Sequence, residues 1–162
     1  MKSVVVETNV IAVANELAEQ ADDNCIVACI EALHTAQKKR KVVIDSGQLL
    51  FQEYFKYANR SGQPRTGDAF IKWLWDNQAN TKRVECVSIS PSAAEPDNFN
   101  EFPNDPNLRQ FDHSDRKFVA VALSSKRNPK ILNATDSDWR DFRDQLKANG
   151  VAIVFLCPQM MK

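Results

Sequence analysis

Short apolar segments typical of buried strands alternate with helical segments along nearly the whole chain, and this alternation constrains the fold most strongly. The first segment, SVVVE at 3–7, is continuous and β-branched, as expected for a strand buried on both faces. Alternation of this kind predicts a three-layer α/β/α sandwich around a mainly parallel central sheet of about five strands. We expect strands at 3–7, 41–46, 83–90, 130–135 and 151–158, and helices at 10–20, 22–39, 47–59, 67–78, 113–125 and 138–150.

Length and charge restrict the class of protein further. A chain of 162 residues with 43% apolar residues is expected to form a single domain over 1–162 with a substantial core. Its 21 basic and 21 acidic residues cancel, so no global field draws it onto a polyanion, and such a partner must be held by local contacts. Four of the seven prolines fall between 91 and 110, which predicts an irregular loop at about 91–112.

The four cysteines show no pattern that requires oxidation. Cys25 and Cys29 are one helical turn apart, and Cys86 and Cys157 fall in strand-like segments, so buried free thiols are expected. A zinc site made from Cys25, Cys29 and His34 lacks a fourth ligand. The sequence shows no secretion signal and no apolar span long enough for a membrane helix, so we expect a cytoplasmic protein that does not bind membranes.

Four acidic residues occupy places where parallel α/β proteins build their sites. Glu7 ends the first strand, Asp136 follows the fourth strand, and Asp115 lies in the first turn of a helix on its apolar stripe. Glu53 lies in the helix after the second strand and has apolar residues at four-residue spacing, so its side chain is expected to point inward. Because ligands bind beyond the carboxyl ends of parallel strands, these four carboxylates are expected to converge.

Helix capping is a competing explanation for part of this set. Acids are favoured in the first turn of a helix, which suffices for Asp115 and Asp136. Asp112 stands three residues before Asp115, so it is either an N-cap or a further site residue. Capping explains neither Glu53, which is expected in the middle of a helix, nor Glu7, which is expected at the end of a strand.

Four carboxylates in one cleft would repel one another, and a divalent cation removes that difficulty. Oxygen ligands without a convincing Cys or His set indicate a hard ion, Mg²⁺ or Mn²⁺. Such an ion activates water and neutralises charge on a phosphate, whereas no P-loop or kinase motif is present. The pattern therefore favours hydrolysis of phosphodiester bonds, with the neighbouring Arg116 and Lys117 contacting phosphates.

Four segments resemble the PIN-domain family of metal-dependent ribonucleases, in the order found in that family. They are VVVETNV (4–10), VVIDSGQLLFQEY (42–54), DHSDRKFVAVAL (112–123) and NATDSDW (133–139). The resemblance implies an α/β/α sandwich whose acidic pocket binds Mg²⁺ or Mn²⁺ and cuts RNA. The chain departs from the family at Glu7, where the family usually has Asp. The extra methylene of Glu moves the carboxylate by roughly 1.3 Å, and catalytic geometry is sensitive to such a shift.

The resemblance also implies roles for individual residues. Its catalytic and metal-binding acids would be Glu7, Glu53, Asp115 and Asp136, with Asp138 as an accessory or alternative metal ligand. Asn9 would hold the first acid or the substrate, and the substrate-binding set would be Asn9, Arg116, Lys117 and Thr135.

We therefore expect a metal-dependent endoribonuclease of the bacterial toxin or phage-defence kind. Its partners would be the RNA substrate and an antitoxin or other defence-system protein, and a homodimer is a further candidate. Two alternatives stay open. One is a catalytically weak or inactive PIN-like module that binds RNA or protein, motivated by Glu7; the other is a structure-selective DNA nuclease.

Overall fold

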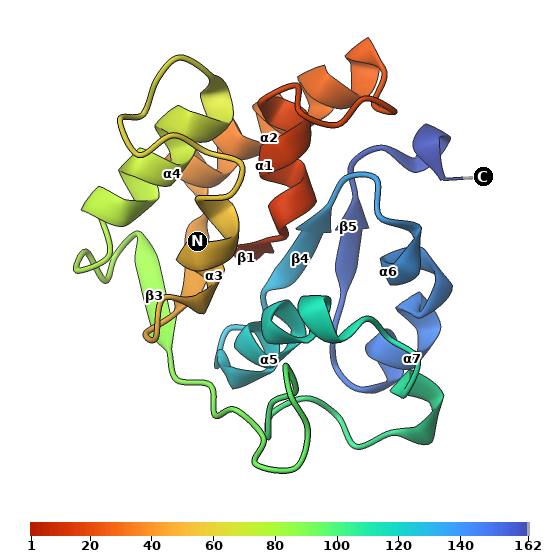
Figure 1. Cartoon of the computed structure of the whole chain (residues 1–162). Coiled ribbons are helices and arrows are strands. Elements are labelled where there is room, and N and C mark those ends of the chain that lie inside the picture. The colour runs from red at the N-terminus through yellow and green to blue at the C-terminus, as the bar shows by residue number, and fades with distance from the viewer. Residues whose placement is uncertain (162) are drawn as a thin grey trace.

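The computed structural model describes residues 1–161, so Lys162, the last residue of the expected domain, lies outside the described part. Figure 1 shows a single sheet flanked by helices. Its five strands are all parallel and run in the order β3-β2-β1-β4-β5. The strands are β1 (Ser3–Val6), β2 (Lys41–Asp45), β3 (Val84–Val87), β4 (Lys130–Asn133) and β5 (Ile153–Phe155). The expected parallel sheet of about five strands is confirmed.

The helices cover both faces of this sheet and complete the three layers. Crossovers between parallel strands are almost always right-handed. Given the strand order, those from β1 to β2 and from β2 to β3 therefore put their helices on one face, and those that lead to β4 and β5 put the later helices on the other. Figure 1 shows α1, α2 and α4 grouped together, with α5, α6 and α7 apart from them. The helices are α1 (Thr8–Ala14), α2 (Asp23–Lys39), α3 (Leu49–Tyr54), α4 (Thr66–Asp76), α5 (Arg116–Ser124), α6 (Ser137–Asp141) and α7 (Arg143–Ala148), with 3-10 turns η1 (Pro106–Leu108), η2 (His113–Asp115) and η3 (Pro158–Met160).

Four helices differ clearly from their expected bounds: α3 covers only Leu49–Tyr54 of the expected 47–59, and the other three differ for local reasons. Helix α1 is shorter than 10–20 because Glu16 adopts a left-handed conformation with φ 58°, which no glycine announces in the sequence. The expected helix at 113–125 begins as the 3-10 turn η2. The expected helix at 138–150 is two helices, because Phe142 leaves helical geometry with φ −106° and ψ 9°.

The expected irregular loop at 91–112 is confirmed. Within it the structure contains only the short turn η1 and an isolated bridge between Pro91 and Phe99. No helix within residues 1–161 has the length and apolar character needed to cross a membrane.

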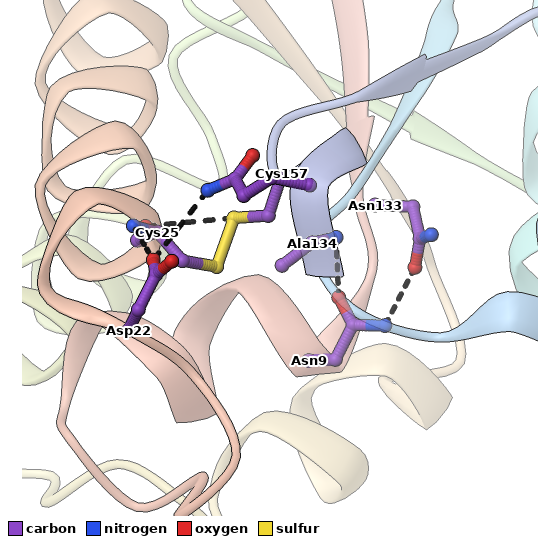
Figure 2. Close-up of a disulfide and its surroundings, with 7 residues drawn as sticks. Asn9, Asp22, Cys25, Asn133, Ala134 and Cys157 are labelled. Carbon is purple, nitrogen blue, oxygen red and sulfur yellow. Dashed lines mark hydrogen bonds between the residues drawn. A yellow bond between two sulfur atoms is a disulfide. The ribbon is translucent and has the colours of Figure 1, made fainter. Parts of the chain in front are cut away.

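The expectation of four free thiols is wrong. Cys25, in the first turn of α2, forms a disulfide with Cys157, and their Cα atoms are 5.2 Å apart (Figure 2). Cys29 is free and buried, whereas Cys86 is free and exposed. Cys157 is also not part of a strand, since β5 ends at Phe155. A separation of 132 residues hides this pair from any local pattern in the sequence.

Candidate functional site

A cleft of about 570 Å³ lies at the carboxyl edge of the sheet, and Glu7, Glu53, Asp115 and Asp136 all line it. Glu7 follows β1 and Asp136 follows β4, two neighbouring strands from which the chain continues in opposite directions along the sheet. This is the topological switch point, where open parallel sheets bind their ligands. The four acids that the sequence predicts to converge therefore share one cleft.

Glu7 is 4% exposed and serves as the N-cap of α1. Its Oε2 accepts a hydrogen bond from the backbone N–H of Asn9 at 2.8 Å. The expectation that capping does not explain Glu7 is thus wrong, because the strand passes directly into the helix without an intervening loop. Since a carboxylate has two oxygens and several lone pairs, the cap leaves acceptor capacity facing the cleft.

Glu53 reaches the cleft from α3, and two contacts fix that helix. Asp45, at the end of β2, accepts hydrogen bonds from the first backbone N–H groups of α3, at 2.8 and 2.9 Å. The hydroxyl of Tyr54 donates to the carbonyl of Val6 at 2.6 Å and holds α3 against the end of β1. The Glu53 carboxylate is paired with Lys117 Nζ at 2.8 Å and with Lys56 Nζ at 3.2 Å. The acid therefore faces the cleft already neutralised by two lysines.

Asp115 and Asp136 approach the cleft from the opposite side of the sheet edge. Asp115 ends η2, immediately before α5, and is 8% exposed. Asp136 is the N-cap of α6, and its Oδ1 accepts from the backbone N–H of Asp138 at 3.0 Å. Capping thus accounts for one oxygen of Asp136, whereas the Asp115 side chain makes no capping bond.

Asp138 and Asp112 lie outside the cleft lining. Oδ2 of Asp138 accepts from the backbone N–H of Asp112 at 3.1 Å and so fastens η2 to α6. Asp112 caps η2 through the N–H of Ser114 at 2.9 Å, which makes it a capping residue in this structure. In this structure the Asp138 carboxylate positions the segment that carries Asp115, and its role as an accessory ligand stays a prediction.

Arg116 also lies away from the cleft, contrary to its expected contact with substrate. Its guanidinium is buried, donates to the carbonyls of Leu108, Arg109 and Phe111, and sits 4.4 Å from the ring centre of Phe102. A buried cation of this kind requires such partners, so Arg116 anchors the 91–112 loop to α5. Thr135, in contrast, does line the cleft.

Two residues at the site were missed in the sequence. The side chain of Asn133, at the end of β4, accepts from Asn9 Nδ2 at 2.6 Å, and Asn9 Oδ1 accepts from the N–H of Ala134 at 2.8 Å (Figure 2). This pair ties the start of α1 to β4. Thr8 lines the cleft, and its buried Oγ1 has no hydrogen-bond partner within residues 1–161. A polar residue ending a buried strand is the only signal that marks Asn133.

Burial and mutual repulsion favour the protonated acids in the absence of a cation. Burial raises the pKa of Glu7 to about 8, and the neighbouring Asp136 and Glu53 add to the shift despite the hydrogen bond from Asn9. Burial also raises the pKa of Asp115 to about 9, with Glu7 and Asp136 contributing. Burial opposes ionisation of Glu53 too, but Lys117 and Lys56 outweigh it and lower the pKa of that group. The ionised forms of Glu7 and Asp115 therefore lack the stabilisation that Lys117 and Lys56 give to Glu53.

The residues of the cleft fit a hard, hydrated cation. The donors are carboxylate oxygens and the unpartnered hydroxyl of Thr8, the ligand type that Mg²⁺ and Mn²⁺ prefer. Among the acids, histidines and cysteines of residues 1–161, the only three ligand atoms within 4.8 Å of one another are sulfurs. The acids are therefore more widely spaced than a closed cage, which suits Mg²⁺, an ion that retains several waters and uses one or two carboxylates.

The fold and the cleft together define a parallel α/β/α protein with an acidic site at the switch point of its sheet. No protein-family model, curated protein or solved structure matches the chain.

Proposed function

We propose that this protein is a metal-dependent endoribonuclease that hydrolyses phosphodiester bonds in RNA. The observation that carries the proposal is the arrival of Glu7, Asp115 and Asp136 from three separate segments at one cleft. Two of these carboxyls have strongly raised pKa values, which is the electrostatic state that a bound cation relieves. The resemblance of the same segments to PIN-domain ribonucleases supports the same reaction.

The residues at the cleft divide into those that would hold the ion and those that would contact the RNA. Glu7, Asp115 and Asp136 would hold the ion, and Mg²⁺ or Mn²⁺ would supply an activated water and neutralise charge on the phosphate. The hydroxyl of Thr135, which lines the cleft, is placed to donate to the substrate backbone. Lys117, bonded to Glu53, brings a fixed positive charge beside the cleft and favours a polyanion.

The biological setting follows from the resemblance. We place the protein in the cytoplasm, as a nuclease of the toxin or phage-defence kind. Its partners would be an antitoxin or other defence-system protein and a second copy of the chain.

The test compares two Asp→Asn variants on RNA and DNA single strands in Mn²⁺ and in chelator. Asp115→Asn is expected to lower RNA cleavage by on the order of a hundredfold or more while the circular dichroism spectrum stays unchanged. Asp76→Asn removes an exposed carboxylate on α4, paired only with Lys72, and is expected to leave cleavage intact. Unchanged cleavage by Asp115→Asn would refute the assignment, and preference for DNA strands would move it to a DNA nuclease.

The ion pairs of Glu53 favour a second candidate function. With Lys117 and Lys56 holding Glu53, and with Glu7 in place of Asp, the cleft also suits a module that binds metal and RNA, or a protein partner, without cutting. RNA binding that requires Mn²⁺, without turnover, would favour this candidate. Turnover by the wild-type protein that Asp115→Asn abolishes would exclude it.

A further inference from the structure

Three cysteine sulfurs lie together beside the N-terminal end of α2. Cys25 and Cys29 are on consecutive turns of that helix, and Cys157 follows β5. All three residues are fully buried, and their sulfur atoms lie within 4.8 Å of one another. His34, the third residue of the incomplete zinc set considered in the sequence, is exposed and is not part of the cluster. The chain thus brings a soft-ligand set together from segments 132 residues apart.

Geometry and ligand type indicate which ion such a set suits. A metal–sulfur bond of about 2.3 Å, the zinc–thiolate value, holds sulfurs roughly 4 Å apart. Structural zinc is almost always four-coordinate, yet no fourth His, Cys or carboxylate atom within residues 1–161 completes this group. Asp22, three residues before Cys25, caps α2 through the N–H of Cys25 at 2.8 Å. Three thiolates without a fourth ligand suit a soft monovalent ion, and thiolate sites select copper(I).

The helix dipole favours a charged ligand at Cys25, whereas burial raises the pKa of the Cys29 thiol to about 12, so Cys29 loses its proton only as a metal ion displaces it. Cys25 is in the first turn of the 17-residue helix α2, where the helix dipole stabilises negative charge. Cys29 lies one turn further along, and the Cys157 sulfur meets both. Figure 2 shows Cys157 and Cys25 joined across the gap between α2 and the segment after β5, so an ion at this place would bridge the same two segments.

We propose that Cys25, Cys29 and Cys157 form a copper(I) site in the reduced protein, and that the Cys25–Cys157 disulfide is the oxidised, ion-free form of the same cluster. A dithiol reductant supplies two electrons and two protons to the disulfide, which yields two thiols and an oxidised reductant. Copper(I) then displaces thiol protons into solvent as the sulfur–metal bonds form. Ion binding and the disulfide exclude one another, because both use the same two sulfurs.

The experiment titrates the anaerobic, reduced protein with copper(I) held by a chromophoric chelator, after the reductant has been removed. The wild type is expected to take up one equivalent in the reduced state and none in the oxidised state. Cys29→Ala keeps the Cys25–Cys157 pair and is expected to bind copper(I) at least tenfold more weakly when reduced. Cys86→Ala, which removes the exposed cysteine outside the cluster, is the matched control and is expected to bind as the wild type does.

Three results of the titration would overturn the proposal. They are equal copper(I) uptake by Cys29→Ala and the wild type, loss of uptake in Cys86→Ala, and equal uptake by oxidised and reduced wild type. A reduced wild type that circular dichroism shows to be unfolded would also overturn it, because the site requires the folded cluster. The oxidised forms of all variants provide the folding reference, since none of them removes the disulfide.

Discussion

Lys117 shows how one residue can change the chemistry of an acidic cleft. Its side chain is 13% exposed and its ammonium lies 2.8 Å from Glu53, on α3. Because a lysine and a divalent ion compete for the same negative charge, Lys117 opposes cation binding while it favours a phosphate. The balance between these two effects can be measured directly.

Replacing Lys117 with methionine is expected to tighten Mn²⁺ binding by on the order of tenfold, because the variant loses a fixed positive charge near the cleft. Lys56→Met is the matched control, since Lys56 also bonds Glu53 but has a largely exposed side chain, where solvent screens its charge. Calorimetric titration with Mn²⁺ measures both affinities. Equal or weaker Mn²⁺ binding by Lys117→Met would show that Lys117 exerts no repulsion on the ion.

The residues of the cleft divide into those that a local pattern marks and those that it does not. Glu7 and Asp136 stand at the ends of strands, and parallel strands end at one edge, so their meeting follows from the fold. The ion pair joins Glu53 on α3 to Lys117 on α5, two residues 64 positions apart in the sequence, and no local pattern indicates it. For the same reason the sequence does not reveal that Arg116 turns away from the cleft.

Among the elements, the 91–112 loop depends on α5 for its position. The buried Arg116 of α5 donates to three carbonyls near the end of the loop and to the side chain of Asn98 at 3.0 Å. A single residue therefore holds two parts of the loop against the helix. This explains how a segment with little regular structure is fixed in one conformation.

The variant Arg116→Met is expected to lower the free energy of unfolding by on the order of 3 kcal/mol, because it strips buried carbonyls of a charged donor. Amide hydrogen exchange within the loop is expected to quicken, while Mn²⁺ affinity stays near the wild-type value. Arg109→Met, which removes an exposed guanidinium from the same loop, is the control. If Arg116→Met kept full stability but lost RNA binding, Arg116 would be a substrate contact as the sequence predicts.

Element type was easier to predict than element length. All five strands and the helices that flank them were expected, with α6 and α7 expected as one helix, since continuous β-branched runs and apolar stripes identify these elements. The ends depend on single backbone conformations, such as the left-handed Glu16 after α1 and the non-helical Phe142 between α6 and α7. These conformations result from tertiary packing, and neither residue type announces them.

For the whole molecule, the raised pKa values link stability to pH. Glu7 moves from 4.5 to about 8 and Asp115 from 3.8 to about 9, so the folded protein holds protons that the unfolded chain has released. The stability that this proton uptake provides is fully present at pH values below the pKa values of the unfolded chain. It is lost as the pH rises through the pKa values of the folded protein. This pH dependence of stability has the opposite sign to that produced by an acid in a salt bridge, which loses its contribution as the pH falls.

In chelator, the melting temperature is accordingly expected to fall as pH rises from about 5 to 9, and Mn²⁺ is expected to restore it at the high end. Glu7→Gln is expected to flatten this dependence, because it stays neutral throughout. Thermal melts at several pH values provide the measurement. A melting temperature that rises over this range in chelator would mean that Glu7 and Asp115 ionise freely in the folded protein.

The disulfide is the whole-molecule feature furthest from sequence prediction. It joins the first turn of α2 to the segment after β5, and pairing over that distance depends on the complete fold. Local spacing gave Cys25 and Cys29 as neighbours but pointed to no third sulfur beside them. The sulfur that completes the cluster comes from near the other end of the chain.

Anomalous diffraction from crystals soaked in Mn²⁺ tests most directly whether the acidic cleft is a metal site. An anomalous peak is expected in the cleft, with Glu7, Asp115 and Asp136 holding the ion directly or through its waters. A data set with Mn²⁺ bound elsewhere on the surface and no peak in the cleft would contradict this expectation.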